Sequence, residues 1–168
     1  RLNYAPIESL NLKFEGGYAS GDQDARDDVY RVFTFHSDYQ IGMVLFDQVM
    51  PMLTARSVDR IHDPELIQQA PASTRFLVNQ GALRNARYLY PVIGYRPTEE
   101  LELKLAYLMA FSAAGAIDPF QSGINGGYNL GFDGEPTTSK NLGQELCLGV
   151  RYTVNAANGL KTTLIAEG

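Results

Sequence analysis

The chain has 168 residues, of which 45% are hydrophobic and 20% charged, and its formal net charge is −5. This composition suits a single globular unit or a β-rich membrane protein, but it excludes a helical membrane span, because no stretch approaches about 18 consecutive apolar residues. The acidic balance, without a basic stripe, argues against a nucleic-acid partner. The single cysteine, Cys147, excludes a disulfide within the chain.

The first predicted strand covers residues 10–19 and follows a short turn after Tyr4-x-Pro6. It ends in an acidic loop, residues 20–28. Carboxylates are the hard oxygen ligands that calcium prefers, and the loop carries four of them: Asp22, Asp24, Asp27 and Asp28. Their spacing lacks the alternating Asp/Asn–Gly–Glu pattern of a calcium loop, so the sequence favours a solvated surface loop and predicts no metal site.

Residues 29–82 form a long insertion. Its apolar run, VFTFHSDYQIGMVLFDQVMPML, is compatible with one strand, a strand pair, or a short helix around residues 41–50. A helix start is predicted further on, with Asp63 as the N-cap residue and Pro64 in the first turn. The pattern favours a long loop that contains a short helix and folds into or over the lumen of a barrel; two further strands are the alternative.

The clearest strand signal comes next. After a predicted strand at residues 83–95, strict alternation runs through residues 101–111. One parity carries Leu101, Leu103, Leu105, Tyr107, Met109 and Phe111, and the other carries Glu102, Lys104, Ala106, Leu108 and Ala110. A period of two indicates a strand. Eleven residues match the ~9–11 that a tilted strand needs to cross a bilayer.

A loop rich in Gly, Asn, Asp and Pro, residues 116–140, precedes a further strand at residues 142–154. Its apolar parity carries Leu142, Leu146, Leu148, Val150, Tyr152 and Val154, with Gln144 as the one polar interruption. The opposite parity carries Glu145, Cys147 and Arg151, which predicts that a thiol reagent small enough for a pore reaches Cys147. A last strand is expected from residue 160 to the end of the chain.

An aromatic residue, a short turn and an alternating strand therefore recur three times, beginning at Tyr4, Tyr95 and Tyr152. Short turns at one end and long loops at the other are typical of outer-membrane barrels. The sequence predicts an all-β fold, an antiparallel transmembrane β-barrel. Because no export signal precedes Arg1 and the chain stops inside a predicted strand, residues 1–168 are expected to be a fragment of a larger barrel. The remaining strands would come from the rest of the chain or from other subunits.

Two runs, FEGGYASGD (14–22) and FTFHSDYQIGMVLFD (33–47), together with the hairpins of tyrosine, turn and Leu-x-Leu, resemble the C-terminal region of alginate-export-type porins and related proteobacterial outer-membrane barrels. In that group a strand ending in Gly-Tyr-x-Ser-Gly-Asp leads to a long, inward-folded extracellular loop. The motif of real specificity here is residues 17–22. The chain lacks the closing strand with a terminal aromatic residue, and it lacks the dense basic cluster of alginate exporters, so that substrate is not implied.

The function expected is a passive outer-membrane channel for small hydrophilic solutes. Its lumen would be lined by the charged residues opposite the apolar parity: Lys13, Glu15, Glu102, Lys104, Glu145, Arg151, Lys161 and Glu167. No nucleophile has a histidine and an acid at recognisable spacing, so we expect no catalytic residues, no enzyme activity and no cofactor. Membrane lipid is the expected partner. A structural or adhesive barrel, or a soluble antiparallel β-domain, is the alternative.

Overall fold

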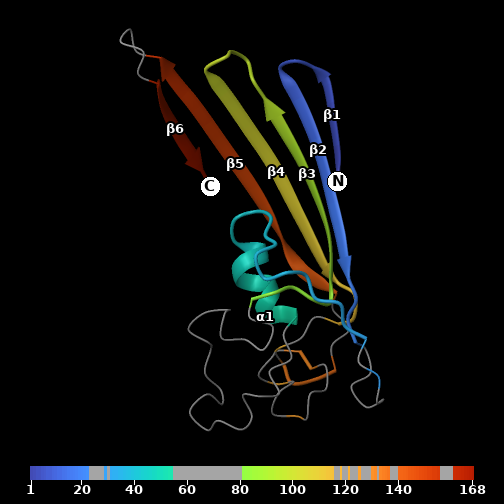
Figure 1. The fold of residues 1–168 in the computed structure, drawn as a ribbon. Helices are drawn as coiled ribbons and strands as arrows, with labels where there is room; N and C mark the ends of the chain where they lie inside the picture. The colour runs from blue at the N-terminus through green and yellow to red at the C-terminus, as the bar shows by residue number, and fades with distance from the viewer. Residues whose placement is uncertain are drawn as a thin grey trace.

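The computed structural model describes residues 1–22, 29, 31–54, 81–115, 118, 121, 125, 130–131, 133–136, 140–155 and 161–168. These residues form one six-stranded antiparallel sheet in which every strand lies next to its neighbours in sequence (Figure 1). The strands are β1 (Leu2–Ile7), β2 (Leu10–Ala19), β3 (Ala86–Tyr95), β4 (Leu101–Ser112), β5 (Asn141–Asn155) and β6 (Lys161–Glu167). Two short helical elements, η1 (Leu45–Val49) and α1 (Met50–Thr54), lie between β2 and β3.

The predicted antiparallel β-fold is confirmed, and so is the arrangement of its connections. The connections from β1 to β2 and from β3 to β4 lie at one end of the sheet, where β5 ends and β6 begins, whereas β2 and β4 end at the other end, where β3 and β5 begin (Figure 1). We call these the turn end and the loop end. The sheet is open: within the described residues, β1 pairs only with β2 and β6 only with β5. No helix in the described part of the chain is long and apolar enough to cross a membrane.

The register divides the sheet into two faces of opposite character. Cross-strand partners share a face, and the pairs Leu12 with Ile93 and Leu105 with Leu148 place large apolar groups together. We call this side the apolar face. Its large exposed side chains are Leu2, Tyr4, Ile7, Phe14, Tyr18, Leu89, Ile93, Tyr95, Leu103, Leu105, Leu146, Leu148, Val150, Tyr152, Val154 and Leu164. The opposite side, which we call the covered face, carries the charged residues of the described strands other than Arg87, and a buried core.

Residues 31–54 cover the loop half of that second face. Phe46 and Met50, from η1 and α1, are fully buried in one cluster with Tyr88 and Leu108 of the sheet. Within 31–54, the β-pairing is a single isolated bridge between Thr34 and Arg84. Of the alternatives left open by the apolar run, the short helix is therefore the one observed, at residues 45–54. The helix start predicted at Asp63 lies outside the described residues.

One predicted side-chain direction is wrong. The sequence assigned Leu142 to the outward apolar parity, whereas Leu142 is only 2% exposed and packs in the core of the covered face. The register advances one residue on β4, from Ala110 to Phe111, while it moves two residues on β5, from Gly143 to Asn141. Leu142 is the extra residue of a β-bulge, which interrupts the alternation. Gly143 adopts φ +126°, a conformation that other residues rarely accept.

Candidate functional site

The covered face brings together the charged residues that the sequence predicted to line a lumen. Glu102 pairs with Arg151 in the register, and Lys104 pairs with Gly149, which in turn pairs with Glu167. Lys13 and Glu15 reach the same face from β2 through their partners Val92 and Tyr90. Glu145 joins them on β5. Lys161 occupies the same face in the register of β6, while its side chain is outside the described set.

At the turn half of the covered face these charges are partly exposed and of mixed sign. Glu102 Oε2 lies 3.0 Å from Arg96 Nη2 and 3.7 Å from Arg151 Nη1, and Lys104 Nζ lies 3.9 Å from Glu167 Oε1. A hollow of about 290 Å³ opens beside Glu102 and Lys104. Exposed ion pairs add little stability because water screens them. These ion pairs therefore hold their side chains only weakly.

At the loop half, Glu145 has a different role. Its carboxylate accepts hydrogen bonds from the backbone N–H groups of Met43 (2.5 Å), Val44 (3.1 Å) and Leu45 (2.6 Å). Bonds of this kind to a charged acceptor are stronger than neutral ones. The chain approaches so closely that a Cβ at Gly42, where φ is +70°, would lie 2.8 Å from Glu145 Oε1. Glu145 thus fixes the start of η1 to the sheet.

A second attachment is made by tyrosine hydroxyls. Tyr39 donates a hydrogen bond of 2.7 Å to Glu15 Oε1, and its hydroxyl also hydrogen-bonds that of Tyr88. Burial, together with these two partners, raises the pKa of Tyr39 well above its usual value, so the phenol stays protonated and donates. The Phe46 ring lies edge-on to the Tyr88 ring with centroids 5.4 Å apart. Polar and aromatic contacts together hold residues 39–46 on the sheet.

The sequence did not predict these attachments. Tyr39 and Tyr88 carry no motif, and their hydroxyls meet across a separation of 49 residues in the sequence. Glu145 was placed on the correct face by its parity, but its backbone partners lie 100 to 102 residues away. The available signal was weak: Gly42 and Gly143 mark places where another part of the chain comes close.

The acidic loop provides only one described candidate ligand for calcium. Asp22 is buried and lies 4.0 Å from Arg31 Nη1. Asp24, Asp27 and Asp28 lie outside the described residues. In the part of the chain that is described, no group of three or more His, Cys, Asp or Glu side chains is arranged to hold a metal ion.

Cys147 leads to a prediction that differs from the sequence expectation. Its side chain has the expected direction, but it is 3% exposed, and its thiol donates to Glu145 Oε1 at 2.9 Å. We expect Cys147 in the folded protein to resist a membrane-impermeant maleimide, and to react fully after unfolding. Mass spectrometry of the labelled protein measures this. In a Cys147→Ser background, Thr153→Cys at the turn half of the same face should react without unfolding. Rapid labelling of native Cys147 would contradict the packing described here.

Comparisons with known protein families, with curated proteins and with solved structures found no match to this chain.

Proposed function

We propose that this sheet is part of the wall of a transmembrane β-barrel in a bacterial outer membrane, and that the barrel passes small hydrophilic solutes. The observation that carries the proposal is the apolar face. Tyr18 is 64% and Leu164 62% exposed, and side chains of similar character cover the strands between them. Soluble monomers rarely expose a continuous apolar patch larger than a few hundred Å². Lipid acyl chains are the environment that such a face suits.

The covered face supports a channel. A barrel wall alternates lipid-facing apolar residues with lumen-facing polar ones, and rings of charge in the lumen select solutes. The mixed charges of Lys13, Glu102, Lys104, Arg151 and Glu167 would line a hydrated passage at the turn half. Residues 31–54 would narrow that passage at the loop half. Transport in this proposal is passive, without a catalytic residue or a cofactor, and the strands that complete the wall come from elsewhere in a longer chain or from other subunits.

A structural barrel without transport is the second candidate. It is favoured by the close packing of Leu45, Phe46 and Met50 against the covered face, because a lumen filled in this way along its whole width conducts nothing. A soluble β-domain is a weaker alternative, since it requires a partner over the apolar face.

Two measurements test the proposal. The purified protein should be monodisperse in a mild detergent and should aggregate when the detergent is removed, because the apolar face would then meet water. Reconstituted into a planar bilayer, it should give discrete conductance steps in potassium chloride. Monodisperse behaviour without detergent would exclude the membrane proposal. Insertion into vesicles without any conductance would favour the structural barrel.

A further inference from the structure

The apolar face contains one charged side chain within the described strands, and that side chain is Arg87. The register places Arg87 of β3 between Tyr18 of β2 and Phe111 of β4, near the loop end of the sheet. Its guanidinium carbon lies 5.7 Å from the centroid of the Phe111 ring. None of the ion pairs between described residues involves Arg87. A cation on a face proposed to meet lipid is costly unless it reaches an anion or the hydrated headgroup region, and the described protein residues supply no anion to Arg87.

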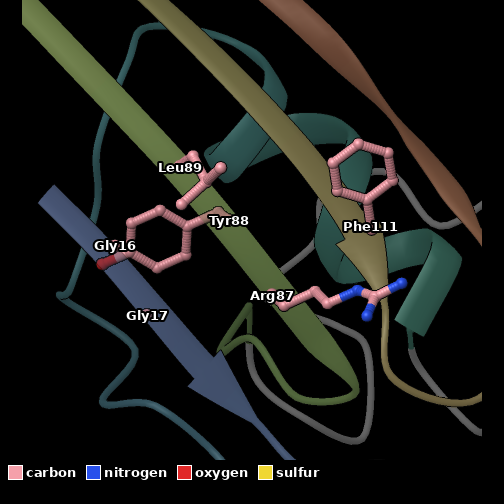
Figure 2. Close-up of a pocket in the computed structure, with 6 residues that line it drawn as sticks. All are labelled: Gly16, Gly17, Arg87, Tyr88, Leu89 and Phe111. Carbon is pink, nitrogen blue, oxygen red and sulfur yellow. The ribbon is translucent and has the colours of Figure 1, made fainter.

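Arg87 borders a groove. A depression of about 440 Å³ is lined by Gly16 and Gly17 of β2, by Arg87, Tyr88 and Leu89 of β3, and by Phe111 of β4. Figure 2 shows these six residues on three adjacent strands, with the Arg87 guanidinium at the loop end below Phe111. Gly16 leaves the floor open: a Cβ there would lie 3.5 Å from Leu89 Cδ2 and would occupy part of the space. The groove is therefore apolar along its length and basic at one end.

We propose that this groove binds one anionic lipid, with its phosphate on Arg87 and one acyl chain lying over Gly16 beside its cross-strand partner Leu89. A guanidinium matches phosphate in geometry and charge and remains charged at any physiological pH. A tyrosine such as Tyr18 is typical of the level at which headgroups meet acyl chains. The apolar end of the groove continues into the apolar face, so an occupant with a polar head and a long apolar tail fits both ends. The inference rests on the proposed membrane location.

The chain contains no tryptophan, so a Tyr18→Trp variant carries a single tryptophan directly beside Arg87 without changing the groove lining. This protein is reconstituted into phosphatidylcholine vesicles doped with either dibrominated phosphatidylglycerol or dibrominated phosphatidylcholine, because bromine quenches tryptophan on contact. One basic residue near a membrane surface contributes about 1 kcal/mol of attraction to anionic lipid, which is roughly a fivefold preference. We therefore expect half-maximal quenching at roughly one fifth as much brominated phosphatidylglycerol as brominated phosphatidylcholine.

Three further variants in the Tyr18→Trp background decide the assignment. Arg87→Gln should abolish the preference, and Arg87→Lys should keep most of it, so a general loss of folding cannot imitate the result. Arg96→Gln is the matched control, because it removes the same charge at the turn end just beyond β3 and should leave the preference unchanged. Equal quenching by both lipids, insensitive to Arg87, overturns the lipid site while the membrane wall stands. Absence of quenching by either lipid overturns the membrane wall and the lipid site together.

Discussion

Leu105→Arg is expected to lower the free energy of unfolding in lipid by about 2–4 kcal/mol, the cost of an arginine on the lipid side of a barrel near the bilayer midplane. Leu105 lies near the middle of β4, on the apolar face, between its partners Ile93 and Leu148. The long side chain would carry its charge into acyl chains with no partner within the sheet. Equilibrium unfolding in urea, with the protein in phosphatidylcholine vesicles, measures the loss.

Lys104→Leu is the matched control for this experiment, because Lys104 is the adjacent residue and points to the opposite face. It loses only an exposed contact of 3.9 Å with Glu167, so its stability should change by less than about 1 kcal/mol. If the two variants lose the same stability, the faces are not lipid and water. If Leu105→Arg is stabilising in detergent-free buffer, the apolar face meets water and the soluble alternative is correct.

Glu145→Ala should release residues 43–45 from the sheet and increase the single-channel conductance. Three backbone N–H groups lose their shared acceptor, and hydrogen bonds to a charged group contribute about 1.5–3 kcal/mol. We expect the amides of Met43, Val44 and Leu45 to exchange with deuterium at least tenfold faster, since every 1.4 kcal/mol, as a rough rule, corresponds to a factor of ten. Hydrogen exchange read by mass spectrometry and conductance in a planar bilayer are the two measurements.

Glu102→Ala provides the control for Glu145. It removes the same side chain from the same face, but Glu102 contacts Arg96 and Arg151 and not residues 43–45. Exchange at Met43 to Leu45 should therefore remain slow in this variant. Fast exchange in Glu145→Ala without a change in conductance would mean that residues 31–54 are attached through Glu145 but do not narrow a passage.

Alternation predicted β2, β4 and β5 within a residue of their observed ends, because each of these strands places large apolar groups on one side and charged or small groups on the other. The same rule placed the start of β3 three residues too early. Asn85 stops the strand there: it has φ 52°, and its side chain bonds the backbone of Ala114 and Gly115. These contacts join chain segments about 30 residues apart, and no local pattern contains that information.

The candidate site, too, could be predicted from the sequence only in part. Parity alone placed Lys13, Glu102, Lys104 and Arg151 on one face, since strand residues two apart share a side. It failed at Leu142, where the bulge adds a residue, and it could not show that Glu15 and Glu145 bind residues 31–54. The apolar run around Phe46 was ambiguous because short apolar segments fit strand and helix equally. Packing of Phe46 in one cluster with Tyr88 and Leu108 favours the helix, and these contacts are tertiary.

The open edges of the sheet affect how the protein should be handled. On β1 and β6, the backbone N–H and C=O groups that point away from the sheet have no neighbouring strand among the described residues. In acyl chains each such group would cost several kcal/mol, and in water the row would serve as a template for another strand. In water without detergent, these 168 residues should therefore grow by edge-to-edge addition into fibrils or ribbons that bind thioflavin. Peptides with the sequence of an edge strand, β1 or β6, should pair with these edges and stop the growth at substoichiometric amounts.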